Sequence, residues 1–139
     1  MTNSVFIDAS FWVVYRDETE VNHAAAKRVL NDLFGRRVHF ATTLPVICEI
    51  YATFSRRRRL REQILEDFWN NPVVKIEDVS HKDESAAIEI LRGNSDKTYS
   101  LCDALSFVVM RRLKITQAVS FDRHFRQFGG FDIMPEKIS

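Results

Sequence analysis

The chain has 139 residues, of which 45% are hydrophobic, including eleven Phe and two Trp, and its formal net charge is only +1. One domain over residues 1–139 with a single core is therefore expected. No apolar stretch reaches the roughly 18 residues of a membrane span, and the N-terminus has no secretion signal, so a cytoplasmic location without membrane contact is expected.

The first part of the chain predicts a strand, a helix and a second strand. Residues 4–8 form a short apolar run typical of a buried strand. Apolar residues at helical spacing then predict a helix that ends at Gly35, with Asp17 and Glu20 as start signals. Residues 38–42 predict the second strand. The pattern is that of alternating strands and helices.

The middle of the chain predicts a helical hairpin and a third strand. A helix begins near Pro45, which the first turn of a helix tolerates, and runs to about residue 54. A second helix follows the arginine run, with apolar residues at helical spacing over 60–69, and ends before Pro72. Residues 73–79 predict the third strand.

The last part continues the same alternation. A capping-box pattern opens a helix over 80–93. The helix predicted over 100–113 is apolar nearly all round, which indicates burial on several faces. Residues 116–121 predict a fourth strand, and residues 131–134 a short fifth. Because parallel neighbours need long crossovers, strands separated by helices predict an α/β sandwich with a parallel sheet.

Four acids follow or interrupt apolar runs, and each has a local explanation. Asp8 can cap a turn, Asp103 stands three residues after Ser100 as in a capping box, and Asp122 can cap a short helix. Glu49 lies in an apolar helix, where a buried charge is costly and needs a partner. In a parallel sheet, Asp8 and Asp122 would face the same rim, and the other two acids can join them from nearby helices.

Considered together, these acids indicate a cation site, because convergent carboxylates without matching bases repel one another. Oxygen ligands suit Mg²⁺ or Mn²⁺ better than zinc, since Cys48 and Cys102 belong to no Cys/His cluster. Both cysteines are interpreted as buried apolar filler. Bound divalent ions hold phosphate oxygens and make a bound water more acidic, which favours hydrolysis of a nucleic-acid backbone.

The ordered motifs FIDAS, a Glu in an apolar helix, SLCDALSF and SFDRHF followed by GGF resemble the PIN domain over essentially the full chain. At this size the sequence looks most like VapC-type toxins of toxin–antitoxin pairs. The resemblance implies a three-layer sandwich with a parallel sheet of about five strands, and Mg²⁺- or Mn²⁺-dependent endoribonuclease activity. It also implies an RNA substrate, a VapB-like antitoxin and a homodimer, for which the hairpin over 44–70 offers apolar surface.

The resemblance also assigns roles to particular residues. It implies that Asp8 and Asp103 are the surest metal ligands, completed by Glu49 and Asp122 directly or through water, and that all four are catalytic. Ser120 occupies the family's Thr/Ser position and can orient a carboxylate or a water. Two further residues stay open. Ser10 can act in the same way near Asp8 or make only a local turn bond, and His124 stands where many relatives carry another acid.

One run of basic residues is a candidate RNA-binding track, which would offset the repulsion between an acidic site and a polyanion. The alternative is an ordinary solvated charged stretch. The run comprises Arg56, Arg57, Arg58, Arg59 and Arg61.

Three other functions compete with that of a toxin endoribonuclease. A PIN-like RNA-binding or regulatory module would not need all four acids. A housekeeping RNA-processing nuclease would keep the chemistry without an antitoxin. A phosphoacceptor receiver domain requires a pair of acidic residues after its first strand, whereas this chain has only Asp8 there.

Overall fold

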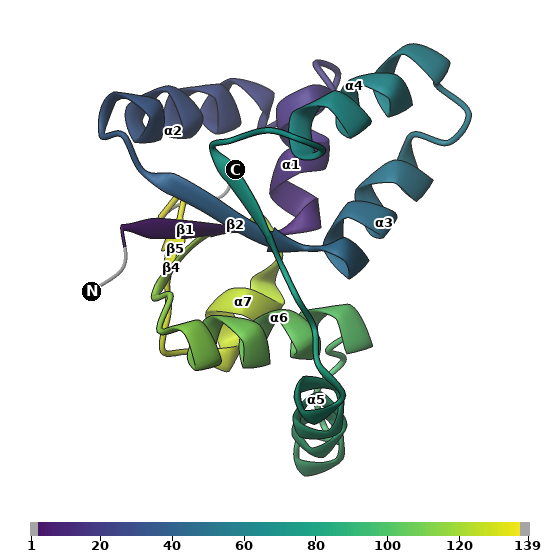
Figure 1. Cartoon of the computed structure of the whole chain (residues 1–139), viewed down its shortest axis with the longest axis vertical. Coiled ribbons are helices and arrows are strands. Elements are labelled where there is room, and N and C mark those ends of the chain that lie inside the picture. The colour runs from purple at the N-terminus through teal and green to yellow at the C-terminus, as the bar shows by residue number, and fades with distance from the viewer. Residues whose placement is uncertain (1–2, 137–139) are drawn as a thin grey trace.

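A five-stranded parallel sheet lies between two layers of helices in the computed structural model, which describes residues 3–136 (Figure 1). The strands stand in the order β3-β2-β1-β4-β5. They are β1 (Ser4–Ile7), β2 (His39–Thr43), β3 (Val74–Glu77), β4 (Gln117–Val119) and β5 (Asp132–Met134). All neighbouring pairs are parallel. The predicted three-layer parallel sandwich is confirmed.

The helices divide between the two faces of the sheet. On one face lie α1 (Ala9–Arg16), α2 (His23–Gly35), α3 (Leu44–Thr53) and α4 (Arg58–Phe68). On the other lie α5 (His81–Gly93), α6 (Leu101–Leu113) and α7 (Arg123–Phe128). The apolar helix predicted at 100–113 is α6, and most of its residues are buried, as expected from its sequence. None of the helices in the described part of the chain has the length and apolarity to cross a membrane.

The strand order places a ligand-binding position in the middle of the sheet. From central β1 the chain proceeds outward on one side to β2 and β3, and later to β4 and β5 on the other side. The order therefore reverses between β1 and β4. In open parallel sheets the crevice outside the carboxyl ends of the strands at such a reversal is where ligands bind.

One helix, α1, was not predicted. Its sequence ASFWVVYR is rich in β-branched and aromatic residues, which favour strands locally. Packing decides otherwise, because Phe11 and Trp12 are buried against the core. The expected start of the next helix is consequently wrong: α2 begins at His23, and Asp17 is the C-cap of α1.

Two smaller expectations also fail. Helix α4 begins at Arg58, so part of the arginine run lies inside the helix and not before it. Cys48 is exposed and Cys102 is half-buried, so neither is simple core filler. Helical geometry explains the first cysteine, since the buried face of α3 is formed by Val46, Ile47 and Ile50.

Candidate active site

The four predicted acids line one hollow at the carboxyl ends of the central strands. Asp8 follows β1 directly, and its backbone N–H donates to Val119 O at the end of β4 (3.1 Å). Asp122 follows β4, Asp103 lies in the first turn of α6, and Glu49 comes from α3. The hollow has a volume of about 640 Å³. We call it the acidic hollow.

Asp8 is buried and held by two serine hydroxyls. Ser10 Oγ donates to Asp8 Oδ2 at 2.5 Å, and Ser120 Oγ donates to the same oxygen at 2.8 Å. The serines in turn accept from backbone N–H groups, Ser10 from Phe121 and Ser120 from Asp122. Although Asp8 is the N-cap residue of α1, its side chain makes no capping bond. The local turn-cap explanation for Asp8 therefore fails.

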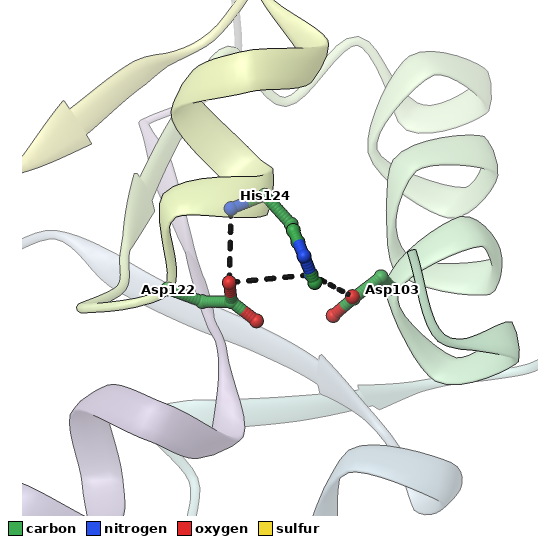
Figure 2. A group of neighbouring side chains, drawn as sticks. All are labelled: Asp103, Asp122 and His124. Atoms are coloured by element: carbon green, nitrogen blue, oxygen red, sulfur yellow. Dashed lines mark hydrogen bonds and ion pairs between the residues drawn. The ribbon is translucent and has the colours of Figure 1, made fainter. Parts of the chain in front are cut away.

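Asp103 and Asp122 combine a capping bond with a place in the hollow. Asp103 Oδ2 accepts from the N–H of Ser100 (3.0 Å), which completes the predicted capping box of α6. Asp122 Oδ1 accepts from the N–H of His124 (2.9 Å), so the predicted cap of α7 is also present. The His124 ring lies between the two carboxylates, as Figure 2 shows. Capping and cation binding are thus compatible here.

Each of the three aspartates keeps one oxygen for another ligand. The donors described above use Oδ2 of Asp8, Oδ2 of Asp103 and Oδ1 of Asp122. Within residues 3–136 the second oxygen of each accepts no hydrogen bond, and His124 is the only base that forms an ion pair with these acids. Oxygen donors that converge without Lys or Arg partners fit a hard divalent cation.

Glu49 is exposed, contrary to the expectation that it is buried and unpaired. Its carboxylate is nevertheless partly desolvated within the hollow. Burial and then the negative charge of Asp103 raise its pKa, while a hydrogen bond from the Cys102 thiol opposes the shift. Burial also raises the pKa of Cys102, with the charge of Glu49 as the next cause, so this thiol stays protonated. Glu49 is the most accessible of the four acids.

The ionised form of Asp8 is unfavourable without a cation. Burial raises the pKa of Asp8 from 3.8 to about 6, although the hydroxyls of Ser10 and Ser120 oppose the shift and the charges of Asp103 and Asp122 add to it. The contribution of Asp8 to the free energy of unfolding is present in full below pH 3.8, the pKa of this group in the unfolded chain. It is lost as the pH rises through about 6.

We therefore expect Asp8→Asn to stabilise the metal-free protein at pH values above 3.8, and not below. Between pH 3.8 and 6 the gain in unfolding free energy should grow to at most about 3 kcal/mol, because about 1.4 kcal/mol accompanies each pKa unit. Urea unfolding of both proteins in EDTA across this range measures the difference. A gain that is independent of pH would contradict ionisation of a buried Asp8.

Two titratable residues of the hollow were not assigned to the site from the sequence. His124 was noted only as a departure from the family pattern, although its position two residues after Asp122 was a usable signal. Glu20, taken as a helix start, also lines the hollow. No pattern in the sequence distinguishes Glu20 from other surface acids.

A parallel sheet of this order with an acidic hollow at its reversal point agrees with the PIN-domain resemblance of the sequence. No protein-family model matches the chain. The chain is 30% identical to the 23S rRNA-specific endonuclease VapC20 of Mycobacterium tuberculosis, over 95% of this chain and 99% of the relative.

Solved structures give the same result. The crystal structure of M. tuberculosis VapC20, a sarcin-ricin loop cleaving toxin, matches with a TM-score of 0.83 and 30% identity, over 94% of this chain and 99% of that chain. VapBC2 from Rickettsia felis, bound to a DNA fragment from its promoter, matches in fold with a TM-score of 0.68 and 15% identity, over 94% and 96% of the two chains. The chain belongs to the VapC family of PIN-domain endoribonuclease toxins.

Proposed function

We propose that this chain hydrolyses RNA phosphodiester bonds with Mg²⁺ or Mn²⁺ held by Asp8, Asp103, Glu49 and Asp122, and that it does so as the toxin of a toxin–antitoxin pair. The observation that carries the proposal is the set of three aspartate oxygens without hydrogen bonds, together with Glu49, around one hollow. Helix capping does not explain why these oxygens meet at one hollow, because the capping bonds use Oδ2 of Asp103 and Oδ1 of Asp122 and leave the second oxygen of each free of hydrogen bonds within residues 3–136.

The residues have distinct tasks in this proposal. A bound divalent ion supplies Lewis acidity toward phosphate oxygens and a more acidic water. Ser10 and Ser120 fix the orientation of Asp8 through its Oδ2. Glu49 would hold the ion through a bound water, and because it is exposed and has a raised pKa it suits a group that takes a proton from that water.

The proposed target is a loop of ribosomal RNA. The support is the 30% identity, over nearly the whole chain, to a 23S rRNA-specific endonuclease. A second hollow, of about 510 Å³, fits the same class of substrate because it is lined by Arg16, Arg57, Arg58 and Arg59. We call it the arginine hollow.

The arginine hollow keeps free positive charge for a polyanion. Arg57 pairs with Asp17 (3.1 Å), whereas Arg58 and Arg59 form no ion pair with any residue in the 3–136 range. Of the other two residues in the predicted track, Arg61 donates to the Ser55 carbonyl oxygen, and Arg56 is exposed. We assign phosphate binding to the arginine hollow, since unpaired guanidinium groups bind phosphate oxygens in bidentate fashion.

A VapB-like antitoxin and a homodimer complete the proposal. Apolar side chains are exposed between α3 and α4, where Leu44, Leu65 and Trp69 are 54%, 42% and 65% exposed. They border a groove of about 570 Å³. Exposed apolar surface of this kind supports contact with another protein chain.

The test is cleavage of a synthetic hairpin with the sequence of the sarcin-ricin loop. With Mg²⁺ or Mn²⁺ present, we expect a defined cut in the loop, and EDTA should abolish it. A hairpin with the same stem and a scrambled loop serves as control. Cleavage that persists after EDTA treatment would refute the proposed metal dependence, and equal cutting of both hairpins would refute the proposed target.

A further inference from the structure

His124 forms a compact group with two of the acids. One ligand atom from each of Asp103, Asp122 and His124 lies within 4.8 Å of the others. His124 Nδ1 is 2.8 Å from Asp103 Oδ2 and 3.3 Å from Asp122 Oδ1, with the ring between the two carboxylates (Figure 2). One imidazole nitrogen beside carboxylate oxygens is a donor set that transition-metal ions accept more readily than Mg²⁺ does.

Contacts from outside the acidic hollow orient the His124 ring. Its Nε2 lies 3.1 Å from Thr98 Oγ1, and Tyr99 packs edge-on against the ring with centroids 5.5 Å apart. Without a cation, Nδ1 donates to Asp103 Oδ2 (2.8 Å). The threonine hydroxyl can donate to Nε2 or accept from it, so Nε2 could carry the ring proton if a cation took the place of the proton on Nδ1. A hydrogen bond on the second nitrogen is how metal-binding histidines are usually held.

The alternative is that His124 is only a counter-ion for Asp103 and Asp122. A counter-ion needs charge but little orientation, and Lys or Arg would supply that charge without a fixed ring. The threonine bond and the aromatic contact both fix the direction of Nδ1. The backbone N–H of His124 also bonds to Asp122 (2.9 Å), so the residue is fixed at both ends. These restraints favour a ligand over a counter-ion.

We propose that His124 supplies a nitrogen ligand to the divalent cation of the acidic hollow and makes this site prefer Mn²⁺ over Mg²⁺. The inference rests on the proposed function, since it concerns the same cation. The reason is that Mg²⁺ keeps oxygen ligands and water. Mn²⁺ is a first-row transition-metal ion and binds imidazole nitrogen more readily than Mg²⁺ does. An aspartate at position 124 would give an all-oxygen site.

The test is pulsed electron paramagnetic resonance of Mn²⁺ bound to the full chain without RNA. We expect nitrogen-14 modulation from a directly bound imidazole in the wild type. The modulation should persist in His81→Asp, which changes an exposed histidine at the start of α5, and should be lost in His124→Asp. In titrations of the two ions, the preference for Mn²⁺ over Mg²⁺ should fall about tenfold in His124→Asp.

A wild-type spectrum without nitrogen-14 modulation, with Mn²⁺ bound, would overturn the inference and leave the proposed function intact. Because this result comes from the wild type, it does not depend on whether a variant folds. Thr98→Val provides a second measurement: loss of the orienting hydroxyl should weaken Mn²⁺ binding about tenfold and keep the modulation. Unchanged Mn²⁺ affinity in that variant would also count against His124 as a ligand. Failure of the wild type to cleave RNA with either ion would instead overturn the proposed function.

Discussion

Replacing Asp103 by Asn is expected to lower RNA cleavage about 10²- to 10³-fold, the usual loss when one group that acts on transition-state charge is removed. Asp103 has the largest number of roles in the hollow. Its charge contributes to the raised pKa values of Asp8 and Glu49, and its Oδ2 contacts His124. The change should be measured as the single-turnover cleavage rate of the sarcin-ricin hairpin at saturating Mg²⁺.

The Asn variant distinguishes the proposed catalytic role of Asp103 from its capping role. An amide oxygen can still accept from the N–H of Ser100, so the capping box of α6 can survive. Asp83→Asn is the control, because Asp83 forms the same capping box with Ser80 at the start of α5. Asp83 also pairs with Arg112 (2.9 Å), so this variant should lose more stability than Asp103→Asn and still cleave RNA. Both variants should be assayed well below their melting temperatures. Equal activity of wild type and Asp103→Asn would show that Asp103 is only a cap.

The capping boxes also explain which parts of the fold could be predicted. Ser80 with Asp83 and Ser100 with Asp103 are local signals, and α5 and α6 begin where they indicate. The parallel sheet followed from the alternation of strands and helices. Helix α1 has no such signal, since Asp8 stands at its N-cap without a capping bond. Tertiary packing alone decides its conformation.

The meeting of the four acids at one hollow was predicted, but the details of their geometry were predicted less well. The strand ends brought Asp8 and Asp122 to one rim, as parallel topology requires. The exposure of Glu49 could have been predicted, because Val46 and Ile50 lie four residues apart and fix the buried face of α3. The contact between His124 and Asp103 joins residues 21 positions apart. It depends on how α7 packs beside α6, which no local pattern reveals.

Asp67 is the clearest residue that sequence reasoning could not find. It is buried and accepts from partners more than 50 positions away in the chain. Trp12 Nε1 and Arg16 Nε both donate to its Oδ2 at 2.8 Å, and Arg16 Nη2 donates to Oδ1 at 2.6 Å. Gln63 adds a bond from within the same helix (3.0 Å). The cluster attaches α1 to α4.

Asp67→Asn is therefore expected to lower the free energy of unfolding by about 3 kcal/mol, because it leaves a largely buried guanidinium without its counter-charge. The Arg16 side chain is 28% exposed and that of Asp67 only 6%. Partial access of water to Arg16 sets the loss at the lower end of the range for broken buried pairs. Urea unfolding in EDTA, followed by circular dichroism, measures it.

Asp32→Asn is the matched control for this prediction. Asp32 also pairs with an arginine, Arg36, but both side chains are more than half exposed (58% and 57%). The loss there should stay below about 1 kcal/mol, as for other surface pairs. Since Arg16 also lines the arginine hollow, Asp67→Asn should free its positive charge for phosphate and strengthen binding of the RNA hairpin, although it destabilises the fold. Equal losses of stability in the two variants would mean that burial adds nothing to the Asp67 cluster and that packing alone holds α1 against α4.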